Sequence, residues 1–230
     1  MQQVIEGALA KLIPGGPHRL QGSSRTDAGV HAFGQVAHVD LPLHARLTPR
    51  KLRAALNAYL PDDIRVMESV RAPKDFNARF DAVAKQYRYT VWNHPAVNPL
   101  LRGRAWHVPT KLDYGAVKRA AGLFVGTRDF RSLTANRGPG LDDAVRTLTR
   151  CRVVRSGPRI TFILEGSGFL YKMCRGVVGT LVQTGMGRFS EADILRILTT
   201  GNRAAAGMTA PAEGLVLWKV SYSGKARRGK

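Results

Sequence analysis

The sequence has few cysteines and no long apolar run. Its 230 residues include 2 cysteines, Cys151 and Cys174, which lie in separate segments and outside any Cys-x-x-Cys spacing. This scarcity argues against a disulfide framework or a cysteine zinc site, and it suits the reducing cytoplasm. No stretch approaches about 18 uninterrupted apolar residues, so we expect no transmembrane helix. The opening segment MQQVIEGALAKL lacks the basic leader and long apolar core that are typical of a signal peptide.

Acidic residues are scarce as well. The chain carries 36 Lys and Arg against 16 Asp and Glu, which gives a formal net charge of +20. Such a field attracts polyanions, and nucleic acid is the first candidate, with an anionic membrane surface as the alternative. Arginine is frequent among the basic residues, and its planar guanidinium suits contacts with phosphates and base edges.

The common cofactor motifs are missing from the sequence. Neither GxxxxGK[ST] nor a GxGxxG that opens a helix is present, so we expect no nucleotide cofactor. The absence of GxSxG argues against a serine nucleophile. His31, His38 and Asp40 lie close together in the sequence but match no metal-ligand spacing, and we expect no metal site.

Hydrophobic periodicity predicts helices and strands that do not alternate strictly. Helices are expected at 3–12, from Thr48 to Pro61, at 113–125, at 170–184 and from Ser190 onward. Strands are expected at 33–41, 64–70, 84–92, 145–154, 159–165 and 215–222. The two strands joined by Ser156-Gly157-Pro158 resemble a hairpin, and 93–110 reads as an irregular connection. These features favour an α+β fold with a mainly antiparallel sheet.

One acidic residue stands out within SRTDAGVHA, at 24–32. Asp27 lies two residues after Arg25, and a neighbouring guanidinium favours the charged form of a carboxylate. A charged carboxylate suits a nucleophile or a cation stabiliser better than a general acid. The alternative is an aspartate that bonds its own backbone in a turn, which is the commoner role of such a residue.

Two further groups are candidates for function. Tyr87 and Tyr89 share one face of a predicted strand, with Arg88 between them, and could stack on bases or fill the core. Arg175 lies on a predicted helix whose other face is apolar, and a partly buried arginine there requires an acidic partner. Asp27 is a candidate for that partner, and simple surface exposure of Arg175 is the alternative.

Five segments in order resemble the tRNA pseudouridine synthases of the TruA type: SRTDAGVHA, KQYRY at 85–89, DF at 129–130, GFLYKMCR at 168–175 and APAEGL at 210–215. The resemblance implies isomerisation of uridine to pseudouridine at positions 38, 39 and 40, in the anticodon stem-loop of tRNA, without metal or cofactor. It also implies a homodimer with a positively charged cleft. Each chain would have two ferredoxin-like or RRM-like subdomains that share a mainly antiparallel sheet, with helices packed on one face.

We expect these subdomains at 1–80 and 81–223, followed by a flexible basic tail at 224–230. The resemblance makes Asp27 the nucleophile and Arg175 the residue that pairs with it and orients it. Arg25 would take the place of the extruded base, and Tyr87 would stack on the uracil.

The chain departs from the family pattern in two places. Family members begin with a strand ahead of the first helix, whereas this chain begins at the helix, and Arg128 stands where a histidine is usual. The sequence leaves open whether Asp27 would attack the sugar, attack the base or start a glycal route. Two other classes also stay open, a non-catalytic RNA-binding protein and a DNA-binding or ribosome-associated module.

Overall fold

A computed structural model describes residues 1–15, 18–42, 44–45, 47–135 and 143–223. The tail predicted to be flexible, 224–230, lies outside the described residues. Within the described part of the chain, no helix is long and apolar enough to cross a membrane.

The chain divides into two compact units. The first unit contains 1–25, 35–83 and the C-terminal residues from 221, and the second contains 26–34 and 84–220. The division does not follow the subdomains predicted at 1–80 and 81–223, because the segment with Asp27 packs with the second unit. Those subdomain boundaries stay a prediction.

The first unit is built around two helices, α1 (Gln2–Leu12) and α2 (Pro49–Tyr59). The hydroxyl of Thr48 caps α2 by accepting a hydrogen bond from the Lys51 amide, as expected for Thr before Pro. Strands β1 (Leu20–Gly22) and β3 (Ala37–Val39) pair antiparallel in a sheet of their own. The unit has a small cluster of buried apolar residues, Ala8, Leu9, Leu56 and Leu60.

The strand predicted at 64–70 is wrong. These residues have no strand pairing, although Ile64 and Val66 do pack against the core of the first unit. The side chain of Asn57 takes the place of a neighbouring strand. It donates to the Val66 carbonyl at 2.9 Å and accepts from the Val66 amide at 2.8 Å. The alternation of apolar residues therefore reflects packing without a sheet.

The second unit contains a seven-stranded sheet with the order β2-β9-β4-β8-β7-β6, in which β5 also pairs with β4. The strands are β2 (His31–Ala32), β4 (Ala82–Asn93), β5 (Trp106–Val108), β6 (Gly126–Asp129), β7 (Val145–Ser156), β8 (Arg159–Gly166) and β9 (Leu215–Tyr222). The pairs β4–β8, β7–β8 and β6–β7 are antiparallel, whereas β2–β9 and β4–β5 are parallel. The α+β class, the mainly antiparallel sheet and the β7–β8 hairpin are confirmed.

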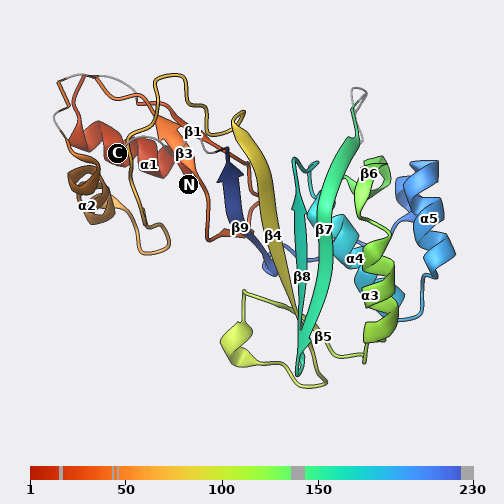
Figure 1. The fold of residues 1–230 in the computed structure, drawn as a ribbon. Coiled ribbons are helices and arrows are strands. Elements are labelled where there is room, and N and C mark those ends of the chain that lie inside the picture. The colour runs from red at the N-terminus through yellow and green to blue at the C-terminus, as the bar shows by residue number, and fades with distance from the viewer. Residues whose placement is uncertain (16–17, 43, 46, 136–142, 224–230) are drawn as a thin grey trace. The chain divides into compact units, whose positions relative to one another are not determined.

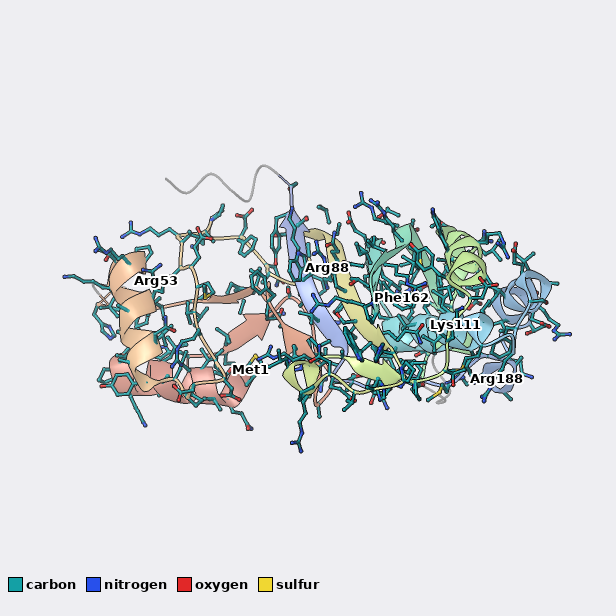
Figure 2. The ribbon with its side chains drawn as sticks, turned by 90° about the horizontal axis from the view of Figure 1, so that it is seen from below. Met1, Arg53, Arg88, Lys111, Phe162 and Arg188 are labelled. Carbon is teal, nitrogen blue, oxygen red and sulfur yellow. The ribbon has the colours of Figure 1, made fainter. Side chains whose placement is uncertain are left out.

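Three helices lie on one side of this sheet, α3 (Tyr114–Gly122), α4 (Met173–Gly185) and α5 (Glu191–Thr200) (Figure 1). Short 3-10 turns, η1 (Pro99–Leu101), η2 (Arg131–Leu133) and η3 (Arg203–Ala205), complete the unit. The helix predicted from Ser190 onward is confirmed, and Ser190 and Asp193 form a capping box at the start of α5. The core between helices and sheet includes the fully buried rings of Tyr89, Phe124 and Phe162, the last of which is labelled in Figure 2.

Candidate active site

The segment with Asp27 is a tight turn that continues into the edge of the sheet. The Val30 amide donates to the Asp27 carbonyl at 3.1 Å, and Gly29 has φ of +80°, a conformation that favours glycine. After the turn, β2 pairs with β9, so the backbone around Asp27 is held by a rigid element of the second unit. The alternative at this position was an aspartate that bonds its own backbone in a turn. The structure has a turn, but the backbone carbonyl of Asp27 accepts its hydrogen bond, and the carboxylate forms an ion pair.

Asp27 and Arg175 form that ion pair. Arg175 Nη1 lies 2.7 Å from Asp27 Oδ2, and the two side chains are 13% and 18% exposed, in the order Arg175 and Asp27. Arg175 Nε also donates to the Ala210 carbonyl at 2.7 Å, while the Ala210 amide donates to the Arg175 carbonyl at 3.0 Å. Because the guanidinium has two fixed acceptors, it can hold one carboxylate oxygen in a defined position.

Tyr87 lies on β4, opposite Leu164 of β8, and its side chain is buried. Its ring contacts that of Phe169 edge to face, with 5.0 Å between ring centroids. Phe169 belongs to the segment that leads into α4 and to Arg175. Phe169 thus connects the strand that carries Tyr87 with the helix that carries Arg175.

Tyr89 has a structural role. It is fully buried, its hydroxyl donates to the Pro211 carbonyl at 2.8 Å, and burial raises its pKa well above the ordinary value. This bond anchors the segment next to Ala210, the acceptor of Arg175. Both tyrosine rings are buried, as the core-filling alternative expects, whereas Arg88 on the other face of β4 lies over the ring of Trp218. A stacking role of Tyr87 stays a prediction.

The fourth predicted site residue, Arg25, is exposed and belongs to the first unit. His31 and His38 have partners of their own. The ring of His31 donates to the Gly103 carbonyl at 2.7 Å, and His38 Nδ1 accepts from the Ala78 amide at 3.1 Å. The described residues contain no group of three His, Cys, Asp or Glu side chains that could hold a metal ion.

The unit that carries the ion pair is strongly basic. The second unit contains 21 Lys and Arg against 9 Asp and Glu, so Asp27 is one of few acidic residues in a basic unit.

Both cysteines are free and buried. Burial first, and then the nearby Cys151 and Asp27, raise the pKa of Cys174 well above the ordinary value. Cys174 is therefore a neutral thiol and no competitor to the carboxylate as a nucleophile.

Sequence reasoning missed two parts of this site. Phe169 lies inside the recognised GFLYKMCR segment, but nothing in a single sequence indicates that its ring meets Tyr87. The carbonyls of Ala210 and Pro211 lie in APAEGL, and their roles depend on backbone position, which side-chain patterns do not reveal.

Comparisons with known proteins show the family of the chain. A family model described as tRNA pseudouridine synthase matches residues 1–81 and 120–223. A tRNA pseudouridine synthase A from Geobacillus kaustophilus is 45% identical over 223 residues, which cover 96% of this chain and 85% of that protein. Proteins of the same name from Methylacidiphilum infernorum and Anoxybacillus flavithermus are 41% and 42% identical over 222 residues. Those alignments cover 96% of this chain and 86% and 89% of the two relatives.

Proposed function

The chain belongs to the tRNA pseudouridine synthase family and is an enzyme that forms pseudouridine in tRNA; we propose that it acts on uridines 38, 39 and 40 of the anticodon stem-loop, with Asp27 as its nucleophile. The observation that carries this proposal is the Asp27–Arg175 ion pair at 2.7 Å. The Asp27 side chain is 18% exposed, so a substrate can reach its carboxylate while Arg175 keeps the carboxylate oriented.

The reaction breaks the N1–C1′ glycosidic bond of uridine, turns the base, and forms a C5–C1′ bond. The base loses its C5 proton and N1 gains a proton, so the conversion is an isomerisation and needs no redox partner. A carboxylate can attack the sugar or the ring, or abstract a ribose proton, and each route places Asp27 at the reacting nucleotide. The uridine must first leave its stack, which costs a few kcal/mol.

Three other residues take part in this proposal. Arg175 orients the Asp27 carboxylate, Tyr87 stacks on the uracil once a substrate opens its contact with Phe169, and Arg25 occupies the place of the extruded base. The basic second unit supplies attraction to the phosphates. We further propose that the chain acts as a homodimer in the cytoplasm, where its tRNA substrate is found.

The test is Asp27→Asn, which keeps the shape of the side chain but removes its charge. Product formation on an unmodified tRNA with a uridine at 39 should fall on the order of 10⁴-fold or more, while the Kd for tRNA stays within about threefold. Mass spectrometry or tritium release measures the product. The matched control is Glu191→Gln, which neutralises an exposed carboxylate paired with Arg119 at 2.9 Å and should leave turnover unchanged.

Three results would contradict parts of the proposal. Wild-type turnover in Asp27→Asn would remove Asp27 from the chemistry. Tight tRNA binding without product from the wild-type chain would favour the non-catalytic RNA-binding alternative. Product outside the anticodon stem-loop, mapped on tRNAs with single uridines at 38, 39 or 40, would overturn the proposed target.

A further inference from the structure

The second unit carries a column of three stacked side chains beside the sheet edge formed by β2. The guanidinium carbon of Arg88, on β4, lies 3.8 Å from the centroid of the Trp218 ring, on β9. The Trp218 ring in turn stacks on Phe33, which follows β2, with centroids 4.9 Å apart and an interplanar angle of 12°. This spacing is close to that of neighbouring strands, so the column runs across β4, β9 and β2. Arg88 is labelled in Figure 2.

Both ends of the column are fixed by hydrogen bonds. At one end, Arg88 Nε donates to Gln86 Oε1 at 3.1 Å, and Gln86 Nε2 donates to Glu165 Oε2 at 2.8 Å. At the other end, the amides of Phe33 and Gly34 both donate to the Leu217 carbonyl, at 2.9 and 3.1 Å. Gly34 permits this close approach, because a Cβ there would come within 2.5 Å of the Trp218 carbonyl oxygen.

The column ends in an exposed ring. Phe33 is 72% exposed, whereas Trp218 and Arg88 are half-buried. One face of Phe33 is covered by Trp218, and β2 is the last strand on this side of the sheet order. An exposed phenyl ring at the end of a stack is unfavourable, because its apolar face is in contact with water. A further planar group that stacks on the ring would cover that face.

The charge beside the column fits a polyanion. Arg152 of β7 and Arg88 of β4 both lie opposite Ile163 of β8, so the two arginines share one row across the sheet face. Arg152 is exposed. A second copy of this chain would bring the same cations against one another, whereas nucleic acid supplies both phosphates and planar bases.

We propose that Phe33 is a stacking site for an unpaired base of the RNA substrate, outside the position of the reacting uridine. This inference rests on the proposed function. Phe33 follows Asp27 by six residues, so it lies at most about 20 Å away. A base within a few nucleotides of the target can therefore reach it. The Arg88–Trp218 contact acts by holding Phe33 ready, because a preorganised ring loses little freedom on binding.

The experiment compares Phe33→Leu with Phe33→Trp in the full chain. The probe is an unmodified anticodon stem-loop RNA with 2-aminopurine placed in turn at each loop position beside the target uridine. Phe33→Leu should raise the Kd about 10-fold and abolish the fluorescence quenching seen at one position. Phe33→Trp should keep both the affinity and the quenching. Turnover at saturating RNA should not change in either variant, since Phe33 does not touch the reacting base.

Two controls separate this site from general effects. Phe80→Leu removes a phenyl ring that is 73% exposed and has Arg79 at 5.4 Å but, among the described residues, no second ring stacked on it. This substitution should leave the Kd unchanged. A fully paired RNA duplex offers no unpaired base, so its Kd should be the same for wild type and Phe33→Leu.

The inference is overturned if Phe33→Leu binds the stem-loop as wild type does, if it weakens duplex binding equally, or if sedimentation shows that it changes the oligomeric state instead. Failure of the proposed function would be seen in a different experiment. The wild-type chain would then make no pseudouridine at uridines 38, 39 and 40, whatever the substitution of Phe33 does to binding.

Discussion

Arg175 and Arg88 use the same side chain in two different ways. Each guanidinium is fixed through Nε, Arg175 by the Ala210 carbonyl and Arg88 by Gln86. The remaining part of Arg175 binds the carboxylate of Asp27, whereas that of Arg88 lies over the ring of Trp218. The first arrangement neutralises the charge and positions a reactive group. The second stiffens an aromatic column, and its charge adds only to the overall positive field of the unit.

Removal of Arg175 is expected to have the largest effect. Arg175→Leu leaves the Asp27 carboxylate partly buried without its cation, which we expect to lower turnover at least about 100-fold and the free energy of unfolding by about 2–3 kcal/mol, given the residual exposure of the pair. Single-turnover kinetics and denaturant unfolding measure the two quantities.

Arg175→Lys sharpens this prediction. An ammonium keeps the charge but lacks the planar fork that reaches Asp27 and Ala210 together. We expect it to recover most of the stability and less of the turnover. If Arg175→Lys turned over like wild type, the simultaneous contact of the guanidinium with Asp27 and Ala210 would not matter for turnover, and the positive charge alone would explain the role of Arg175.

Substitution of Gly179, where the backbone of α4 lies against Met208 and Ala210, is expected to have the next largest effect on stability and turnover. Gly179 lies one turn after Arg175, and a Cβ there would overlap the Met208 carbonyl oxygen and approach the Ala210 amide at 3.1 Å. Gly179→Ala should therefore displace the segment that holds Arg175, with a loss of about 1–3 kcal/mol in the free energy of unfolding and a parallel loss of turnover.

Gly7 in α1 supplies the matched control, because a Cβ at that position would meet no described atom within 4 Å beyond the neighbouring residues and the backbone of its own helix. Gly7→Ala should stabilise the helix by about 0.5–1 kcal/mol and leave turnover unchanged. Equal effects of the two substitutions on thermal or denaturant unfolding would show that the contacts of Gly179 do not matter.

Local patterns predicted the elements that depend on neighbours in the sequence. The cap at Thr48, the capping box of α5 and the β7–β8 hairpin all follow from residues a few positions apart. The pairing of Asp27 with Arg175 was a hypothesis from chemistry, since a partly buried arginine needs an acid, and 148 positions separate the two residues.

Other features could not be predicted because they depend on which face of a strand is covered. Alternation along β4 correctly separated Tyr87 and Tyr89 from Arg88, but it does not say which side faces the helices. The structure buries the tyrosines and leaves Arg88 on the opposite face, where β9 and the short β2 bring Trp218 and Phe33 beside it. The parallel pairing of β2 with β9 joins segments that no local pattern connects.

Substitution of Arg88 is expected to have the smallest effect, because Arg88 acts on RNA through Trp218 and Phe33. Arg88→Lys keeps the positive charge but loses the planar contact over the Trp218 ring at 3.8 Å and the geometry of the bond to Gln86. We expect the Kd for the stem-loop to rise about threefold, with an unchanged salt dependence and unchanged turnover at saturation.

In the background of Phe33→Leu, the substitution Arg88→Lys should have no further effect on the Kd, since the column would already have lost its terminal ring. Fluorescence titration at several salt concentrations gives the Kd of the wild type, the two single variants and the double variant. Additive effects of the two substitutions would mean that Arg88 binds phosphate directly, and the contrast between an arginine that positions a carboxylate and one that stiffens a ring stack would then fail.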